Sequence, residues 1–319
     1  MHVKAGLAGA SIALSVLATA LGGFVAFSPG QTLFSPLARV LDAYAPHLLL
    51  LGFVLGGLGW FLRARLAGGL AALIAMILGL WLTAAYLAVT SPGDPDARAD
   101  LRVLWFNLRE DNTTDPGTLL DALLASKADI VVLAEASFLA GALSEVFSFV
   151  SPCPGGNCGL LVATRQKSER FWRLSLNPVW EGRYAVIELG TPDGRLVFVS
   201  AVHLAKPWMS VVADVERARL TAQYNWFDGP VIAVGDFNMP PWSQPMRKIL
   251  QDTGFQALRW QPATWPAHAR GLRLPIDQVL LRGGPAIVSV RTFGSELGSN
   301  HLGIIADISL EPASAEADE

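Results

Sequence analysis

The chain has 319 residues, of which 52% are hydrophobic and 16% are charged, and its formal net charge is −3 at pH 7. This length allows a membrane region together with one globular domain. The first ninety residues contain only four of the 24 basic and one of the 27 acidic residues, so the rest of the chain is acidic overall. A protein that grips long nucleic acid usually presents a basic face, and this charge balance argues against that class.

Three uncharged apolar runs lie in the first ninety residues, at 5–27, 46–62 and 66–90. Each falls within the range of roughly 17 to 25 residues that a helix needs to cross a bilayer, the middle run only just. Glycines in the last two runs permit close helix packing. We therefore predict that residues 1–90 form a transmembrane region of three helices.

The basic residues predict the orientation of these helices. Lys4 precedes the first run, and Arg63 and Arg65 separate the second from the third, whereas Arg39 is balanced by Asp42. The positive-inside rule places the N-terminus in the cytoplasm and the rest of the chain outside it, as in a multi-pass protein of a bacterial-type inner membrane. If the first run is instead a cleaved signal peptide, two spans remain and the domain faces the same side.

Residues 91–100, rich in Pro, Gly and Asp, are expected to form a linker, residues 101–310 a globular domain and residues 311–319 an acidic tail. Apolar runs and turn residues predict strands at 101–108, 129–134, 159–164, 183–189, 196–202, 231–234, 276–282, 286–292 and 303–310. Helices are expected at 116–127, 137–147, 211–226 and 243–253. This mixture indicates two mixed β-sheets packed together with helices outside them.

The two cysteines of the chain, Cys153 and Cys158, lie in the turn-forming sequence Cys-Pro-Gly-Gly-Asn-Cys. An exported domain sits in an oxidising compartment, which favours a small structural disulfide between them. The other possibility is half of a zinc site, but the sequence nearby offers no partner ligands. We therefore predict the disulfide.

The segment Val-Ile-Ala-Val-Gly-Asp-Phe-Asn at residues 231–238 joins an apolar run to two polar side chains. The run predicts a buried strand, Gly235 permits a turn, and Asp236 and Asn238 then project from the strand end. A carboxylate and an amide held there can ligate a hard divalent cation and orient a phosphate or a water. Taken alone, the segment is explained more simply as a structural Asx-type turn.

Other polar residues also stand at or near the ends of predicted strands, namely Asn107, Glu135, His203, Asp277 and His301. Taken singly, each has an ordinary explanation as a turn cap, a solvated edge residue or a core histidine. Strand ends that converge on one rim of a sandwich are where binding and catalytic sites are usually built. We therefore expect these residues to lie together.

Five motifs follow Asn107 in a fixed order: Val-Leu-Ala-Glu135, Val-His203-Leu, Gly-Asp236-Phe-Asn238, Ile-Asp277-Gln-Val and Ser-Asn300-His301-Leu. The ordered set resembles the endonuclease/exonuclease/phosphatase superfamily over about residues 100–310. The resemblance implies an α/β (α+β) fold, the DNase I-like four-layer sandwich of two mixed β-sheets flanked by helices. In this chain the three predicted transmembrane helices precede it.

The resemblance implies that Glu135 is the principal metal-binding carboxylate, for Mg²⁺ or Mn²⁺, with Asn107 beside it. The last motif of the superfamily is normally Ser-Asp-His, and here Asn300 stands in the place of the aspartate. Asparagine retains the shape and one acceptor oxygen but removes a negative charge near the metal. We expect weaker metal binding or a lower rate, and the alternative is a degenerate relative without activity.

The resemblance also implies the catalytic roles. His203 would contact the scissile phosphate and protonate the leaving oxygen, while Asp236 and Asn238 would orient the attacking water and bind a phosphate oxygen. His301 would act as a general base or stabilise the transition state, with Asp277 orienting its ring. Two histidines that titrate near neutrality suit acid and base roles in such a reaction.

Three further residues are candidates to bind the substrate. Arg109 follows Asn107 closely, and Lys206 and Trp208 follow His203. The two cations can hold a phosphate, and the tryptophan can contact lipid or a base. Solvated surface charge and core packing are the ordinary alternatives for such residues.

These inferences predict a membrane-anchored, divalent-metal-dependent phosphohydrolase, either a phosphodiesterase or a phosphatase, with its active site outside the cytoplasm. The short linker keeps the site near the membrane surface, so the favoured substrate is a phospholipid or a lipid-linked (pyro)phosphate. An extracytoplasmic nuclease is the alternative, and it would need a basic groove for nucleic acid. A non-catalytic, membrane-tethered binding domain is the third possibility.

Overall fold

The computed structural model describes residues 2–24, 33–153, 156, 158–168, 170–191 and 194–310. The chain divides into two compact units. The first consists of Met1–Ala88 with Lys206–Val211 and Trp242–Arg247, and the second contains the remainder.

The first unit contains four helices: α1 (His2–Gly22), α2 (Ser35–Ala43), α3 (Ala45–Phe61) and α4 (Arg65–Leu87). Only α1 and α4, among the described helices, are long and apolar enough to cross a membrane individually. The 17 residues of α3 fall short, although α2 and α3 qualify together as one broken span bent by 72°. The predicted three spans are therefore corrected to two, or to three if the bent pair counts as one.

The helix ends also differ from the predicted spans. The last residues of the predicted span 5–27 lie outside the described residues. The predicted span 66–90 ends early, because α4 stops at Leu87 and Thr90 already belongs to a strand.

Small residues let the helices of the first unit approach closely. The hydroxyls of Ser11 and Ser15 on α1 donate to the carbonyls of Leu55 and Gly52 on α3, each at 2.6 Å. A Cβ atom on Gly56 would lie 2.6 Å from the backbone nitrogen of Ala72 on α4. In an apolar surrounding, such packing and interhelical hydrogen bonds hold helices together.

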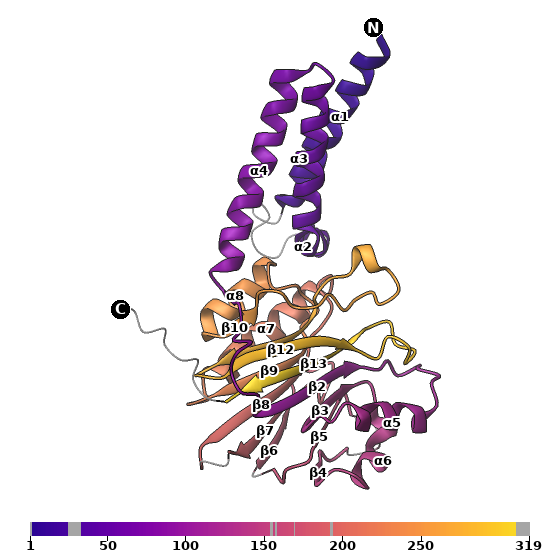
Figure 1. Cartoon of the computed structure of the whole chain (residues 1–319), viewed down its shortest axis with the longest axis vertical. Coiled ribbons are helices and arrows are strands. Elements are labelled where there is room, and N and C mark those ends of the chain that lie inside the picture. The colour runs from indigo at the N-terminus through magenta and orange to yellow at the C-terminus, as the bar shows by residue number, and fades with distance from the viewer. Residues whose placement is uncertain are drawn as a thin grey trace. The chain divides into compact units, whose positions relative to one another are not determined.

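The second unit is built on two stacked mixed sheets (Figure 1). The seven-stranded sheet runs in the order β1 (Thr90–Ser91), β10 (Gln256–Leu258), β11 (Asp277–Arg282), β9 (Val231–Asp236), β8 (Leu196–His203), β7 (Tyr184–Gly190) and β6 (Arg170–Leu174). The six-stranded sheet runs in the order β12 (Ala286–Phe293), β13 (Gly303–Ser309), β2 (Leu101–Asn107), β3 (Ile130–Ala134), β5 (Leu160–Thr164) and β4 (Phe149–Val150).

Along each strand, alternate side chains point into the space between the two sheets and form the hydrophobic core there. Trp105 and Val132 from the six-stranded sheet pack in one buried cluster with Ile187, Val199 and Val234 from the seven-stranded sheet. Because successive side chains of a strand point to opposite faces, the intervening residues are directed outward, toward the helices.

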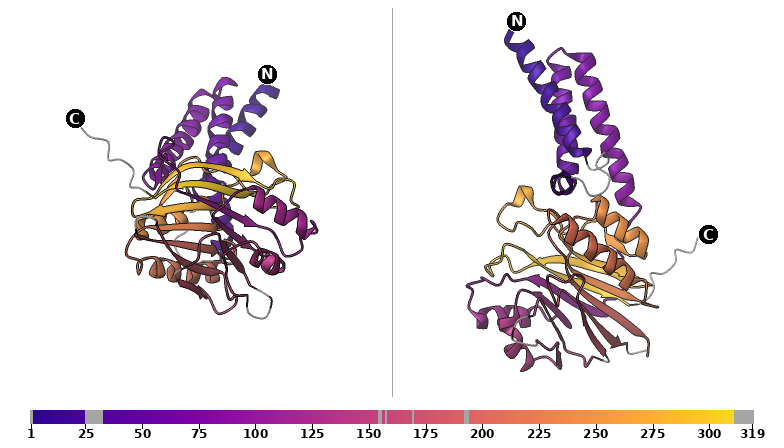
Figure 2. Two further views of the ribbon diagram at one scale, coloured as in Figure 1. Left: turned by 60° about the horizontal axis from the view of Figure 1, so that its bottom comes forward. Right: turned by 180° about the vertical axis from the view of Figure 1, so that it is seen from behind.

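Helices cover both outer faces (Figures 1 and 2). α5 (Pro116–Ala125) and α6 (Ala140–Ser144) lie over the six-stranded sheet, where Leu119 and Leu143 pack with Phe106. α7 (Ser210–Tyr224) and α8 (Gln244–Thr253) lie over the seven-stranded sheet, and the ring of Tyr224 contacts that of Tyr184. The prediction of a four-layer sandwich with helices outside is confirmed.

Several parts of the second unit differ from the expectation. Thr90 and Ser91 pair with β10, so the segment expected to be a linker begins with a strand of the domain. The short strands β4 and β10 and the half-exposed strand β6 were not predicted, because they lack an apolar run long enough to stand out.

Cys153 and Cys158 form the predicted disulfide. The predicted acidic tail, 311–319, lies outside the described residues.

Gly235 has a different role from the one expected. It lies inside β9 and does not form a turn. A Cβ atom there would lie 2.0 Å from the carbonyl oxygen of Val202 on β8, so only glycine permits this close approach of the two strands. The chain turns later, at Asn238, whose φ is 54°.

We predict that Gly235→Ala lowers the melting temperature of the detergent-solubilised chain by at least about 5 °C, because the methyl group overpacks the contact between β8 and β9. The matched control is Gly141→Ala on α6, where an added Cβ meets nothing within 4 Å. That control should leave the melting temperature unchanged or slightly higher. Equal melting temperatures for the two variants would contradict the role assigned to Gly235.

Candidate active site

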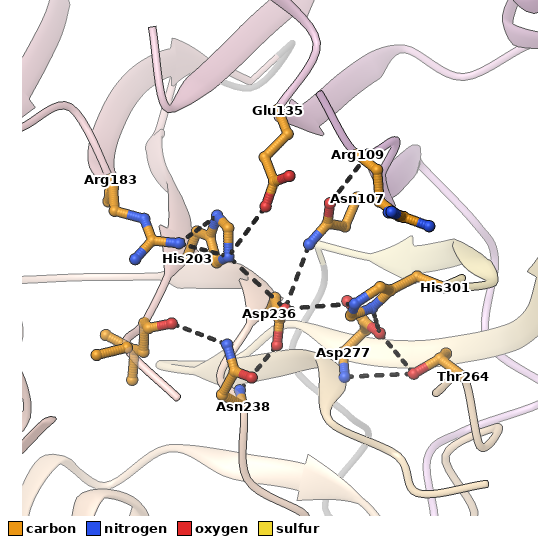
Figure 3. Close-up of polar contacts among 12 residues, drawn as sticks. Asn107, Arg109, Glu135, Arg183, His203, Asp236, Asn238, Thr264, Asp277 and His301 are labelled. Atoms are coloured by element: carbon orange, nitrogen blue, oxygen red, sulfur yellow. Dashed lines mark hydrogen bonds and ion pairs between the residues drawn. The ribbon is translucent and has the colours of Figure 1, made fainter. Parts of the chain in front are cut away.

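The candidate site lies at one rim of the sandwich, where strands of both sheets end. The parallel pairs β2–β3 and β8–β9 bring their carboxyl ends to this rim, and β11 begins there because it is antiparallel to β9. The register sets Asp236 opposite His203 on one side and Asp277 on the other. Side chains that are far apart in the sequence therefore face one another (Figure 3).

Asp236 stands at the centre of the site, and its side chain is 2% exposed. Its Oδ1 accepts a hydrogen bond from the backbone N–H of Asn238 at 2.8 Å, and its Oδ2 accepts one from the amide of Asn107 at 3.4 Å. The same Oδ2 lies 3.8 Å from Nε2 of His203 and 3.9 Å from Nε2 of His301. Two imidazoles thus face one carboxylate oxygen from opposite sides (Figure 3).

Asp277 orients His301. Its fully buried carboxylate contacts Nδ1 of His301 at 2.9 Å and accepts hydrogen bonds from the hydroxyl of Thr264 at 2.5 Å and the indole N–H of Trp105 at 2.7 Å. With three partners, this carboxylate is held in one orientation, so it directs Nε2 of His301 toward Asp236.

Asp236 and His301 have pKa values that differ from those of free side chains. Burial and the neighbouring charge of Asp277 raise the pKa of Asp236 to about 7. Burial lowers the pKa of His301, but the carboxylates of Asp277, Asp236 and Glu135 raise it by more, to about 9. The raised pKa favours the imidazolium form of His301 at neutral pH, and this form stabilises negative charge.

His203 ends β8 and is in contact with an arginine. Nη2 of Arg183 lies 2.7 Å from Nε2 and 3.1 Å from Nδ1 of the His203 ring. Arg183 directly precedes β7, and its carbonyl accepts the backbone N–H of His203 at 2.9 Å. The pairing of β7 with β8 therefore fixes the two residues beside each other.

Glu135 follows β3 with a φ of 55°, a left-handed conformation that is uncommon for residues other than glycine. Such backbone strain is frequent at functional sites. Its side chain is 37% exposed, with Oε1 3.9 Å from Nε2 of His203 and Oε2 accepting the backbone N–H of Glu110 at 3.2 Å. The carboxylate therefore retains free lone pairs on the open side of the site.

Asn300 has a buried amide oxygen that needs a partner. Its Oδ1 is buried, and among the described residues it has no hydrogen-bond partner. The backbone on either side is fixed, because the hydroxyl of Ser299 donates to the carbonyl of Asn107 at 2.6 Å and the carbonyl of Asn300 accepts from Ala267 at 2.8 Å. Buried amide oxygens are normally paired, so a missing ligand is a physical explanation.

The site offers two sets of groups for a cation. Ligand atoms of Asp236, Asp277 and His301 lie within 4.8 Å of one another. Asp277, however, already accepts three hydrogen bonds, and we regard this group as an acid–base cluster. The exposed carboxylate of Glu135 and the unpaired oxygen of Asn300 are the better ligands, since hard divalent cations prefer oxygen.

The three expected substrate-binding residues have other partners. Arg109 forms an ion pair with Asp111 at 2.5 Å and is 40% exposed. Lys206 and Trp208 belong to the first unit, where the ammonium lies 5.5 Å from the centre of the indole ring.

Sequence inspection did not identify Arg183, Trp105, Thr264 or the buried Glu216 as parts of this region. Trp105 and Thr264 contact Asp277 directly, and Arg183 contacts His203. Only Arg183 had a sequence signal, a cation after a glycine at the start of a predicted strand. The others have no signal, because a tryptophan in a strand or a threonine in a loop is ordinary.

The family of the chain follows from comparison with known proteins. The model of the Endonuclease/Exonuclease/phosphatase family matches residues 104–301, and the chain belongs to this family. The match begins in β2 and ends at His301, so it includes every strand end that forms the site. No curated protein matches the sequence.

Solved structures show the same fold. An endonuclease/exonuclease/phosphatase from Beutenbergia cavernae DSM 12333 matches with a TM-score of 0.53 and 20% identity, covering 67% of this chain and 72% of that chain. The human Nocturnin catalytic domain with bound sulfate anion has a TM-score of 0.52 and 16% identity, covering 67% and 96%. A family protein from Leptotrichia buccalis C-1013-b has a TM-score of 0.50 and 14% identity, covering 66% and 99%.

We predict that the metal-free chain loses stability as the pH rises from 7 to 9. His301 binds a proton in the folded state up to about pH 9, whereas an unfolded histidine releases it near pH 6.5, so the folded state holds more protons in this window. The free energy of unfolding should fall by about 1 kcal/mol per pH unit.

The measurement is thermal unfolding in EDTA at several pH values, with His301→Gln as the comparison. In that variant the free energy of unfolding should change less between pH 7 and pH 9 than in the wild type. An equally steep loss of stability in His301→Gln would contradict the assignment.

Proposed function

We propose that the chain is a divalent-metal-dependent phosphohydrolase. Proteins of its family typically hydrolyse phosphate esters. The observation that carries the proposal is the placement of Oδ2 of Asp236 between the imidazoles of His203 and His301, at 3.8 and 3.9 Å. Hydrolysis needs a group that accepts a proton from water and another that donates one to the leaving oxygen, and these groups must share one pocket.

Glu135 would hold the cation, Mg²⁺ or Mn²⁺, with the amide oxygens of Asn107 and Asn300 as neutral ligands. This donor set fits, because the Glu135 carboxylate is exposed on one side and Oδ1 of Asn300 is buried without a partner among the described residues. When bound, the cation neutralises negative charge on the phosphate.

The chain's own residues account for the proton transfers. Asp236 and Asn238 orient the attacking water, and Asp236, with its pKa raised to about 7 by burial and by Asp277, accepts the water's proton. The water oxygen attacks phosphorus, the ester bond breaks, and His203 gives a proton to the leaving oxygen. The His301 imidazolium, held by Asp277, stabilises the negative charge that develops.

A phospholipid or lipid-linked (pyro)phosphate is the substrate class we propose. Only two residues separate the end of α4, at Leu87, from the first strand of the domain, at Thr90. Leu87 and Thr90 are three Cα–Cα steps apart and therefore lie at most about 11 Å from each other, so a membrane that contains α4 is close to the start of the domain. Substrates embedded in that membrane are therefore at high local concentration.

The location we propose is extracytoplasmic, on a bacterial-type inner membrane. Lys4, Arg63 and Arg65 favour a cytoplasmic N-terminus by the positive-inside rule. The Cys153–Cys158 disulfide supports an oxidising compartment for the domain.

We predict Mg²⁺-dependent release of p-nitrophenol from p-nitrophenyl phosphate or bis-p-nitrophenyl phosphate by the purified chain. Glu135→Gln should lower kcat/KM at least about 100-fold, because it removes the principal charge that holds the cation. Glu145→Gln, at an exposed glutamate just after α6, is the matched control and should leave the rate unchanged.

The variant Asn300→Asp tests, in the same assay, the effect of the negative charge that asparagine at position 300 lacks. A carboxylate there adds a charged ligand, so half-maximal activity should need roughly tenfold less Mg²⁺. Absence of turnover in both the wild type and Asn300→Asp, on both substrates, would favour a non-catalytic binding domain.

Parallel assays on phospholipid vesicles, polyprenyl pyrophosphate and DNA identify the substrate class. We expect phosphate or headgroup release from a lipid and none from nucleic acid. Salt-sensitive degradation of DNA, with no lipid turnover, would instead establish a nuclease.

A further inference from the structure

Arg183 is a half-buried cation that lies beside the ring of His203. Among the described residues, its guanidinium makes hydrogen bonds only to the ring of His203, and no carboxylate lies within ion-pair distance of it. Burial lowers its pKa, while Glu216, Asp236 and Glu135 act in the opposite direction from farther away. Buried charges are normally paired, and an imidazole nitrogen is a weak substitute for an anion.

The surroundings hold this guanidinium in place. Its central carbon lies 5.0 Å from the centre of the Trp180 ring, a cation–π distance. The backbone N–H groups of Val179 and Trp180 both donate to Oδ1 of Asn177, at 2.7 and 2.8 Å, which fixes the turn that carries the indole.

A buried glutamate lies behind this turn. Glu216 on α7 is fully buried and accepts hydrogen bonds from the amide of Asn177 and from the backbone N–H of Ala205. One carboxylate thus connects the turn that carries Trp180 to the segment that follows His203. The position of Arg183 is therefore determined by the fold on two sides.

We propose that Arg183 binds a non-bridging oxygen of the substrate's phosphate. When the substrate binds, this phosphate oxygen takes the place of the His203 ring as the hydrogen-bond partner of the Arg183 guanidinium. This inference rests on the proposed function, since it requires a substrate phosphate bound next to Arg183, whose guanidinium lies beside the His203 ring (Figure 3). A planar guanidinium matches two oxygens of a tetrahedral anion and remains charged at any working pH. The phosphate would supply the charge that the buried cation lacks.

The experiment measures binding of inorganic phosphate to the detergent-solubilised full chain by calorimetry, together with kcat and KM for p-nitrophenyl phosphate. Arg183→Gln should weaken phosphate binding and raise KM by about 10- to 100-fold, with a smaller change in kcat. Arg183→Lys keeps the charge but loses the planar fork, so its affinity should fall between those of the wild type and Arg183→Gln.

Arg282 provides the matched control. It is also a half-buried arginine, 5.2 Å from the centre of an aromatic ring. However, it lies at the last position of β11, and the site lies at the first position of this strand, Asp277. Its guanidinium donates to the carbonyls of Thr253 and Phe227. Arg282→Gln should lower the melting temperature and leave phosphate affinity unchanged.

The outcomes separate this inference from the proposed hydrolysis. Arg183-dependent phosphate binding without turnover of any substrate supports the inference and refutes the hydrolase. Turnover with unchanged phosphate affinity in Arg183→Gln overturns the inference, because the arginine then acts only through His203. Failure of the wild type to bind phosphate, or an equal loss of affinity in Arg282→Gln, also overturns it.

Discussion

The buried carboxylate of Asp277 is the interaction on which the site depends. Burying a carboxylate out of contact with water costs several kcal/mol unless hydrogen bonds and opposite charge compensate. Trp105 from the six-stranded sheet, Thr264 from a loop, and the ring of His301 provide that compensation. The two sheets must therefore stack in the correct register for the carboxylate to be satisfied. The same contact that joins the sheets also sets the direction of His301.

Neighbouring charges contribute to the shifted pKa values of Asp236 and His301. Two buried carboxylates in neighbouring strands repel, which raises the pKa of Asp236 and makes the imidazolium form of His301 favourable. Arg183 adds a second cation near Asp236 and Glu135. With asparagine at position 300, this cluster carries one negative charge fewer than an aspartate there would give it.

The N-terminal apolar helices and the domain differ in how fully the sequence predicted them. Uncharged length identified the apolar helices, but the break between α2 and α3 was not visible in composition, and α3 alone is too short to span. In the domain, long apolar runs predicted the central strands well. Short strands such as β10, which is defined by its pairing with β1 and β11, were missed because pairing is not a local property.

The sequence by itself determined the family, the sandwich of two sheets and the set of polar residues at strand ends, because ordered motifs and alternation are local patterns. Only the tertiary structure decided which groups touch. It placed Asp236 between two imidazoles, made Gly235 a contact between strands, and brought Trp105 and Arg183 to the site. These facts depend on strand register and on burial, and neither is encoded at any single position of the chain.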